Sequence, residues 1–275
     1  MASDSYIFQG FNQLVLHKFM VKVSLVTTVF NRDKYISAAI ESVLSQQHRD
    51  FEYIIWDDGS TDNSLEIANF YAQQDSRIKV ISANHEGRGI ALSKACQHLT
   101  GKYFGLVDSD DLLSVDCLAE TVNFLNLNTH VDLVYTNYVV VDADSQFKGY
   151  GTNSDVVYSP EKLLTEFMVF HFRLMKTSIF EKVGGFDPTF NYCQDYDLCL
   201  KISEVGEIQH LKKPLYYYRQ HSGSISFDKR LEQLLFSKRA IEDALKRRNM
   251  DAAFELEFQI FARCTLYRKS VDRGQ

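Results

Sequence analysis

Short apolar runs alternate along the chain with segments whose apolar residues recur at helical spacing. The apolar runs predict strands over Val21–Val29, Phe51–Trp56, Ile78–Ala83 and Lys102–Val107. Apolar residues three and four positions apart predict helices that end near Leu44, follow Asp62, and run from about Gly89 to Leu99. Strands that alternate with helices in this way are typical of βαβ units and a mainly parallel sheet. The predicted fold class is therefore α/β.

The rhythm changes beyond about residue 130. We expect a strand over Val131–Val141, a loop or hairpin over Asp142–Ser159 and a helix from Pro160. A short helix from Thr177, a further helix over Asp195–Val205 and a strand over Ile208–Tyr218 are expected to follow. From Asp228 the chain is predicted to be helix-rich.

The tail is predicted to contain two helices. The first carries an apolar stripe that includes Leu234 and Leu245, and the second, from about Phe254 to Leu266, is apolar on several faces. A helix that is apolar on several faces must be buried, so we expect packing on the core or on a second copy as a homodimer. The first helix also carries basic residues at Lys238, Arg239, Lys246, Arg247 and Arg248. They fit either anionic lipid at the inner membrane face or a solvated helix face paired with nearby acids.

Charge and cysteine content narrow the function classes. The 275 residues include 30 Lys and Arg against 36 Asp and Glu, for a net charge of −6, so a grip on nucleic acid is not expected. The 5 cysteines form no CxxC pair, which argues against a zinc ribbon or a disulfide framework. No signal peptide is recognisable at the start, and no apolar run reaches the roughly 18 residues of a membrane span. We expect a cytoplasmic protein.

Aspartates gather in three loops that directly follow predicted strands. The loops Thr28–Asp33, Asp57–Asp62 and Asp108–Asp111 hold seven of them. Because parallel strands end at the same sheet edge, where α/β proteins bind ligands, these loops are expected to be neighbours. Asp108 and Asp110, two positions apart on a turn, can both face one hard cation such as Mg²⁺ or Mn²⁺. The alternative is a solvated turn with helix-capping aspartates.

Other polar residues are candidates for binding and catalysis. A carboxylate of the Asp57–Asp58 pair can accept hydrogen bonds from the N–H groups of a nucleobase, and Arg88 can pair with a diphosphate. The glycines around Arg88 do not form a dinucleotide fingerprint, because Leu92 stands where the third glycine belongs. Asp195 near a helix N-terminus is suited to act as a general base. Capping, or a solvated arginine, is the simpler explanation in each case.

Seven segments occur in an order that resembles the family 2 glycosyltransferases, which have the GT-A fold. They are Val23–Asn31, Ser42–Gln47, Ile54–Asp62, Asp108–Asp111, Gly184–Asp187, Gln194–Leu198 and Tyr218–His221. The resemblance covers about Val21 to Ser226 and implies a GT-A domain over residues 21–227. It leaves residues 1–20 as an N-terminal extension and residues 228–275 as a helical C-terminal extension.

The resemblance implies an inverting transfer of a sugar from a nucleotide diphosphate sugar, usually UDP-linked, in polysaccharide or glycoconjugate synthesis. The acceptor would be a hydroxyl of a sugar or lipid-linked glycan. By the same resemblance the nucleotide-binding residues are Thr28, Phe30, Asn31, Asp57, Asp58, Arg88, Asp108 and Ser109. The Mn²⁺ or Mg²⁺ ligands are Asp108, Asp110 and His221, and Asp195 is the catalytic base.

The chain departs from the family pattern at two places. Gln194 replaces the glutamate that often precedes the base, and Thr27–Thr28 replace a proline in the first strand-end motif. Gln194 keeps open the alternative of a degenerate protein that binds nucleotide sugars or glycans without turnover. A nucleotidyltransferase is a second alternative, although it should have a glycine-rich loop where Phe30–Arg32 stand.

Overall fold

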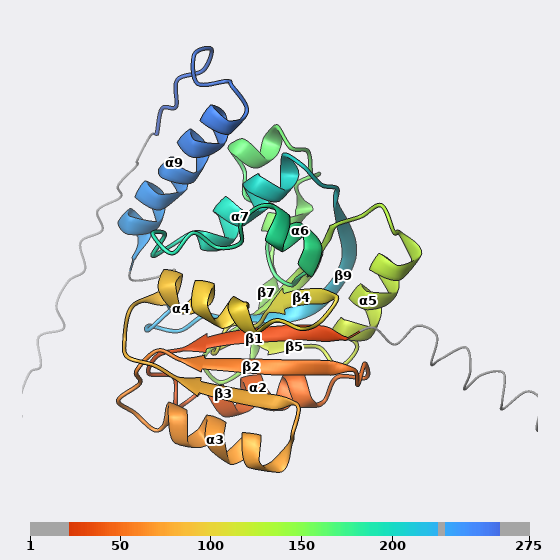
Figure 1. Cartoon of the computed structure of the whole chain (residues 1–275), viewed down its shortest axis with the longest axis vertical. Coiled ribbons are helices and arrows are strands. Elements are labelled where there is room, and N and C mark those ends of the chain that lie inside the picture. The colour runs from red at the N-terminus through yellow and green to blue at the C-terminus, as the bar shows by residue number, and fades with distance from the viewer. Residues whose placement is uncertain (1–21, 225–228, 259–275) are drawn as a thin grey trace, which may run out of the picture.

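The computed structural model describes residues 22–224 and 229–258, which form one α/β unit (Figure 1). Its strands are β1 Val23–Val29, β2 Phe51–Asp57, β3 Ile78–Ser82, β4 Tyr103–Leu106, β5 Leu112–Leu113, β6 Leu133–Val141, β7 Phe147–Tyr150, β8 Arg173–Lys176 and β9 Ile208–Arg219. Its α-helices are α2 Ile36–Leu44, α3 Ser64–Gln74, α4 Arg88–Ala95, α5 Cys117–Leu127, α6 Thr177–Lys182, α7 Gln194–Ser203 and α9 Arg230–Arg247. Short 3₁₀ turns cover Cys96–His98, Asn153–Asp155 and Lys162–Leu164.

The strands form one sheet in the order β3-β2-β1-β4-β8-β6-β9-β5, with β7 paired to β6. Strands β3, β2, β1 and β4 are all parallel, as the alternation of strands and helices predicts. Beyond β4 the sheet is mixed, because β8 is antiparallel to both of its neighbours. The α/β class is confirmed, and the parallel half is the part whose strand ends converge on one edge.

The parallel half of the sheet is buried on both faces. Strand β1 is fully buried along its length, with Val26 facing one apolar cluster and its neighbour Leu25 facing the other. Helix α4 packs into the cluster of Val26, whereas α2 packs into the cluster of Leu25. This explains why the strand is an unbroken apolar run rather than an alternating one.

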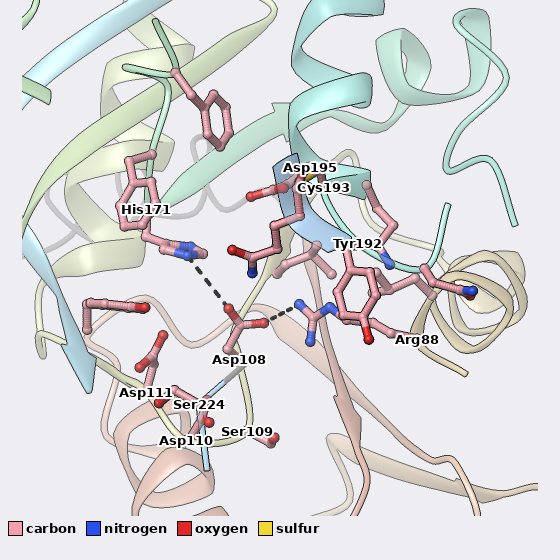
Figure 2. A pocket seen from close by; sticks show the side chains of 18 of the residues that line it. Arg88, Asp108, Ser109, Asp110, Asp111, His171, Tyr192, Cys193, Asp195 and Ser224 are labelled. Atoms are coloured by element: carbon pink, nitrogen blue, oxygen red, sulfur yellow. Dashed lines mark hydrogen bonds and ion pairs between the residues drawn. The ribbon is translucent and has the colours of Figure 1, made fainter. Parts of the chain in front are cut away.

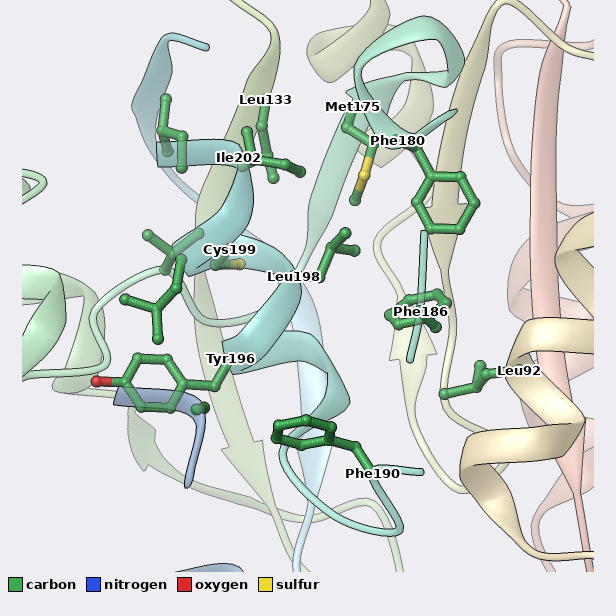
Figure 3. Packing of buried hydrophobic residues seen from close by; sticks show 14 of the residues in the cluster. Leu92, Leu133, Met175, Phe180, Phe186, Phe190, Tyr196, Leu198, Cys199 and Ile202 are labelled. Carbon is green, nitrogen blue, oxygen red and sulfur yellow. The ribbon is translucent and has the colours of Figure 1, made fainter. Parts of the chain in front are cut away.

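Helix α7 is the centre of the larger cluster (Figure 3). Leu198, Cys199 and Ile202 of this helix pack against apolar side chains of β6, β8 and α6. Helix α9 then buries Ala240, Ile241, Ala244 and Leu245 in the same cluster. This packing fixes the N-terminus of α7 relative to the sheet edge.

Most predicted elements are confirmed, and three differences stand out. Helix α5 was not predicted, although its buried residues recur at helical spacing. The helix expected from Pro160 is only a 3₁₀ turn, because the chain there turns to bury Leu163 and Leu164 instead of continuing. The second tail helix is wrong for residues 254–258, which are not helical, and its remainder lies outside the described residues. The N-terminal extension also lies outside the described residues.

None of the helices in the described part of the chain is long and apolar enough to cross a membrane.

Candidate active site

The three aspartate-rich loops meet at the carboxyl edge of the parallel strands. Strand β1 lies between β2 and β4, so the loops after these strands are adjacent. The Asp33 backbone N–H donates to the Asp62 carboxylate at 3.0 Å, and Arg32 Nε lies 3.2 Å from Asp110 Oδ2. The expected clustering of the loops is confirmed.

A cavity of about 700 Å³, the Phe30 cavity, opens over the ends of β1 and β2. Thr28, Phe30 and Asp58 line it together with His85. The Phe30 and His85 rings stack with centroids 3.9 Å apart. Asp58 is held in place by backbone N–H groups of Glu86 and Gly87, each 3.0 Å from one of its oxygens, and by His85 Nδ1 at 2.8 Å. The cavity therefore offers aromatic faces beside a fixed carboxylate.

A second cavity of about 450 Å³, the Asp195 cavity, lies beyond the end of β4. Its wall includes Asp108, Asp195 and Arg173, and aromatic side chains from the segment that precedes β8. Helix α9 contributes Gln233, Leu234 and Ser237, among other residues. The segment after residue 228, expected to be a separate C-terminal extension, therefore contributes side chains to this site.

The two cavities share part of their wall. Five residues line both of them: Arg32, Arg88, Ser109, Asn191 and Tyr192. Figure 2 shows Arg88 reaching across to Asp108, with Tyr192 beside it and Asp195 farther along the Asp195 cavity. A molecule that occupies both cavities must pass these two arginines.

Asp108 is tightly paired. Arg88 Nη2 lies 2.5 Å from Oδ1, and His171 Nε2 lies 3.6 Å from Oδ2. Burial acts to raise the pKa of Asp108, but attraction to Arg88 and other nearby cationic groups outweighs it and lowers this pKa to about 2. Asp108 is therefore ionised at neutral pH.

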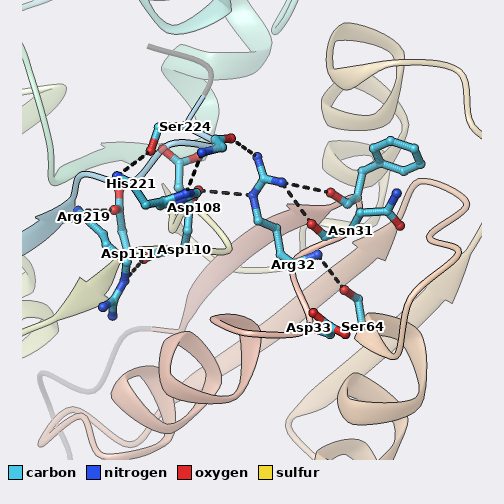
Figure 4. A network of polar contacts seen from close by, with 12 residues as sticks. Asn31, Arg32, Asp33, Ser64, Asp108, Asp110, Asp111, Arg219, His221 and Ser224 are labelled. Atoms are coloured by element: carbon cyan, nitrogen blue, oxygen red, sulfur yellow. Dashed lines mark hydrogen bonds and ion pairs between the residues drawn. The ribbon is translucent and has the colours of Figure 1, made fainter. Parts of the chain in front are cut away.

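Asp110 faces a different set of partners (Figure 4). Its Oδ2 lies 3.0 Å from His221 Nε2 and 3.2 Å from Arg32 Nε. His221 itself is buried against the Tyr35 ring, 4.5 Å between centroids, and Gly223 N–H donates to its Nδ1 at 3.2 Å. The sequence predicted a cation at the carboxylates of Asp108 and Asp110. In the structure the guanidinium groups of Arg88 and Arg32 already balance part of their negative charge.

The residues fit a hard divalent cation at Asp108 and Asp110, whose carboxylates are partly exposed to the Asp195 cavity. His221 fits less directly, because an Nδ1 that accepts from Gly223 leaves the proton on Nε2. Ligation through Nε2 would require the other tautomer.

A second group of possible ligands, Asp108, Asp111 and His171, lies within reach of one ion. Arg173 Nη2 lies 3.3 Å from His171 Nδ1, and a guanidinium only donates, so Nε2 of His171 carries the proton and points to Asp108. Asp111 is buried and accepts from Tyr216 Oη and Arg219 N. Burial and the nearby Asp110 and Asp108 raise the pKa of Asp111. This group is better suited to hold its hydrogen bonds than to bind a metal.

Asp195 lies in the first turn of α7, which begins after Cys193 in a left-handed conformation with φ of 58°. The carboxylate faces the cavity, and its Oδ2 lies 2.9 Å from Arg173 Nη2. Gln194 is buried and donates to the Phe190 carbonyl at 2.9 Å. The amide at this departure from the family pattern thus braces the loop before α7.

Two predicted nucleotide-binding residues line neither cavity. Asn31 Oδ1 accepts from the Thr61 backbone N–H at 2.8 Å, and Asp57 is buried and accepts from the Ser60 N–H at 3.2 Å. Both residues shape the loops that carry Phe30 and Asp58. His221 also lies outside both cavities and reaches the site through Asp110.

Sequence reasoning missed several wall residues, among them Arg32, His85, Arg173 and Tyr192. Arg173 carried a signal, since it is a charged residue within the apolar segment Met168–Leu174. A buried charge needs a partner, and here the partner is Asp195.

The basic residues that fit a lipid-binding surface on the tail all have acidic neighbours: Lys238, Arg239, Lys246, Arg247 and Arg248. Arg247 binds Glu204 through Nε at 2.8 Å and Nη2 at 2.9 Å, which ties α9 to the end of α7. Lys238 and Arg239 each lie 3.6 Å from an acid one turn further along the helix, Glu242 and Asp243 respectively. These pairs favour the solvated helix face over a lipid-binding surface.

Comparisons with known proteins identify the family of this chain. The sequence profile described as Glycosyl transferase family 2 matches residues 24–184. A chondroitin synthase of Escherichia coli is 33% identical over 207 residues, which are 75% of this chain and 30% of that protein. A hyaluronan synthase of Pasteurella multocida is 35% identical over 211 residues, 75% of this chain and 21% of the relative. The chain thus spans less than a third of the length of these relatives.

A relative of similar size is the glycosyltransferase GlyG of Streptococcus pneumoniae, 30% identical over 232 residues, with 74% of this chain and 72% of GlyG covered. Among solved structures, S. aureus TarS 1-349 in complex with UDP has a TM-score of 0.64 and 22% identity, covering 82% of this chain and 65% of that one. The mannosyltransferase PcManGT from Pyrobaculum calidifontis, in complex with GDP-Man and Mn²⁺, has a TM-score of 0.57 and 18% identity, covering 86% of this chain and 77% of that one. These structures confirm the expected GT-A fold. The profile match over more than half of the chain and the relatives at 30% identity or more show that this chain belongs to glycosyl transferase family 2.

Proposed function

We propose that this glycosyltransferase moves a sugar from a UDP-linked donor to an acceptor hydroxyl, with inversion at the anomeric carbon and with Mn²⁺ or Mg²⁺. The product would be part of a polysaccharide or glycoconjugate. The observation that carries the proposal is the pair of cavities joined at Arg32 and Arg88. One cavity suits a nucleoside, the other suits a sugar and an acceptor, and cations line the passage where a diphosphate would lie.

The donor assignment rests on the Phe30 cavity. Phe30 and His85 offer aromatic faces to a base, and Asp58 offers carboxylate oxygens to the base's N–H groups. The solved relatives support a nucleotide donor, since they hold UDP, UDP-GlcNAc or GDP-Man. A carboxylate acceptor for a ring N–H suits uracil, although guanine also offers N–H groups.

Asp108 and Asp110 would hold the divalent cation. The cation, when bound, would supply positive charge to the leaving diphosphate. The chain's own contribution at this point is Arg88, which stands at the first residue of α4 beside Asp108 and can stabilise the same charge. The Mn²⁺ in the PcManGT complex agrees with this choice of ion.

Asp195 would act as the general base. The acceptor oxygen attacks the anomeric carbon as the bond to the diphosphate breaks, and Asp195 takes the acceptor's proton. A single displacement of this kind inverts the anomeric configuration. Arg173 holds the base in its orientation through the 2.9 Å ion pair, so we assign it a positioning role.

The acceptor would enter along the wall made by α9 and the aromatic segment before β8. This wall combines Leu234 and Phe167 with polar groups such as Ser237 and Gln233. A mixed apolar and polar wall suits a sugar, which stacks its ring faces and hydrogen-bonds its hydroxyls. The chondroitin, hyaluronan and O-antigen proteins among the relatives support a glycan acceptor, free or lipid-linked.

A donor screen followed by a turnover assay tests the proposal. Thermal stabilisation by UDP-sugars and by GDP-mannose with Mn²⁺ identifies the donor, since a ligand at 100 times its Kd adds about 2.7 kcal/mol of stability. Release of nucleoside diphosphate with a glycan acceptor, blocked by a chelator, establishes metal-dependent transfer, and NMR of the product gives the anomer. Donor binding without any turnover would favour the degenerate binding protein. Membership of a glycosyltransferase family leaves the nucleotidyltransferase alternative without support.

A further inference from the structure

Arg32 lies in the passage between the two cavities, and the mechanism above gives a specific role at the diphosphate only to Arg88. It stands in the loop between β1 and α2 and lines both cavities, as Arg88 does from the start of α4. Arg32 was absent from the sequence-based site residues. Its position raises the question of what a second guanidinium contributes there.

Backbone contacts set the place of the Arg32 guanidinium. Nη1 donates to the Asn31 carbonyl at 3.0 Å, Nη2 donates to the Gly223 carbonyl at 3.0 Å, and the Arg32 backbone N–H donates to Ser64 Oγ at 2.8 Å (Figure 4). The side chain is therefore fixed between the first strand-end loop and the loop after β9. Its one carboxylate partner among the described residues is Asp110.

That pairing with Asp110 is open to exchange. Asp110 is one of the two carboxylates best placed for a divalent cation, and a cation bound there competes with Arg32 for the same oxygen. Nη2 also carries a second N–H beyond the one that Gly223 accepts. A guanidinium is planar, remains charged at all working pH values and matches the spacing of phosphate oxygens. Arg32 can thus offer its Nε–H and the second Nη2–H to an anion without leaving its backbone partners.

The balance of charges in the passage also favours binding of an anion by Arg32. Asp108 and Asp110 carry two negative charges, and Arg88 and Arg32 carry two positive ones. The positive charge of a bound divalent cation and the negative charge of the diphosphate cancel each other. Because the cation would bind Asp108 and Asp110, both arginines remain available to the diphosphate. We propose that Arg32 binds the diphosphate of the donor together with Arg88, which makes it a second donor-binding cation, contributed by the loop after β1. This inference rests on the proposed function.

The test compares two ligands that differ only in the phosphates. UDP and uridine are titrated into the full chain with Mn²⁺ present, for wild type, Arg32→Gln and Arg32→Lys. Arg49→Gln is the matched control, because Arg49 is exposed, lines neither cavity and donates to the Leu44 carbonyl at 3.1 Å. We expect Arg32→Gln to weaken UDP binding by about 10- to 100-fold, the factor for losing one charge-assisted hydrogen-bonding group.

Uridine binding should stay within about 2-fold of wild type in the same variant, since Phe30, His85 and Asp58, which would hold the base, are unchanged. Arg32→Lys should recover part of the UDP affinity, because it keeps the charge and loses the forked geometry. Equal losses for UDP and uridine would show that Arg32 only supports the loops, and unchanged UDP binding would also overturn the inference. If UDP did not bind the wild-type protein, the proposed UDP-linked donor would fail together with the inference. Binding to wild type with no effect of Arg32→Gln would remove the inference alone.

Discussion

The guanidinium of Arg173 and the carboxylate of Asp195 form an ion pair, with Nη2 of the arginine 2.9 Å from Oδ2 of the aspartate. Arg173 is the first residue of β8 and is almost completely buried, whereas Asp195 lies in the first turn of α7 and faces the cavity. Arg173 is fixed in turn, because its Nη1 donates to the Val169 carbonyl at 2.9 Å. The proposed base Asp195, near the N-terminus of α7, is thus oriented by an arginine of strand β8.

Replacing Arg173 should separate orientation of the base from donor binding. In Arg173→Lys the charge remains but the two-sided contact to Val169 and Asp195 is lost, so we expect kcat to fall by roughly 10- to 100-fold. The Kd for UDP with Mn²⁺ should stay near the wild-type value, because Arg173 does not line the Phe30 cavity. Steady-state kinetics with calorimetry of UDP binding checks this. A parallel loss of UDP affinity and thermal stability would indicate a purely structural role.

Asp195→Asn should remove the base while preserving its shape. We expect turnover to fall by about 10²- to 10⁴-fold, the usual contribution of a general base, with donor affinity unchanged. The loss should be seen at every pH at which the wild type is active, since an amide has no basic oxygen to recover. If donor affinity fell together with turnover, Asp195 would belong to the donor site.

Asp110→Ala should abolish metal-dependent donor binding. Asp110 is exposed to the cavity and its partners are Arg32 and His221, so its removal eliminates one of two proposed ligands and leaves Arg32 without its carboxylate. Isothermal titration of Mn²⁺ with UDP measures the effect, with Asp33→Ala on a neighbouring loop as the control. Full activity of Asp110→Ala in the presence of a chelator contradicts metal use at this position. His221→Ala should only raise the Mn²⁺ concentration required, since His221 reaches the site through Asp110.

Glu52 offers a test of the fold that is independent of the active site. Its Oε1 accepts from Ser24 Oγ at 2.5 Å, Thr100 N at 2.7 Å and Thr100 Oγ1 at 2.8 Å, which joins β2 to β1 and to the turn before β4. Burial acts to raise the pKa of Glu52, but the hydrogen bonds from Ser24 and Thr100 outweigh it and lower this pKa. A lowered folded-state pKa stabilises the fold above the unfolded-state value of about 4.3, and this stability is lost as the pH falls through the folded-state value.

Glu52→Gln should therefore lower the free energy of unfolding by about 1 kcal/mol at pH 7, a value reduced for the partial exposure of the carboxylate. The difference from wild type should shrink below about pH 4.3, where the unfolded-state carboxyl also becomes protonated. Urea unfolding at pH 7 and at pH 4 measures both values, and activity should be unaffected. A difference that is equal at the two pH values would mean that ionisation of Glu52 contributes nothing.

The strand-end loops could be predicted from the sequence because they follow from local patterns. Strands that are buried on both faces have continuous apolar sequences. Parallel strands bring Asp33, Asp58 and Asp110 to one edge of the sheet, whatever the detailed packing of side chains. Arg173 could not be paired with Asp195 in advance, because their contact depends on how β8 enters the sheet antiparallel to β4. Family resemblance named Asp195 but held no information on the residue that orients it.

Other parts of the site escaped prediction for related reasons. Asn31 and Asp57 carry the family motif, yet local hydrogen bonds turn them into the loops and away from both cavities. Helix α9 has the composition of an amphipathic surface helix, and only its packing on α7 shows that one flank of it lines the Asp195 cavity. The segment after Pro160 contains apolar residues suited to a helix, but the burial of Leu163 and Leu164 is satisfied by a single turn.

The basic residues of α9 give the final prediction, which concerns membrane binding. Arg247 donates three hydrogen bonds to the Glu204 carboxylate, and Arg248 Nη2 donates to Ser203 Oγ at 2.9 Å, so both cations are bound to the end of α7. A cation that is already paired gains little from an anionic lipid, because binding must first replace its protein partner. We expect the protein to remain in the supernatant when it is sedimented with phosphatidylcholine vesicles containing phosphatidylglycerol at about 0.15 M salt, where exposed charges are screened. Lys238→Gln with Lys246→Gln should behave identically. Pelleting of the wild type that is lost in this double variant would instead identify α9 as a peripheral membrane surface, and would favour a lipid-linked acceptor over a free glycan.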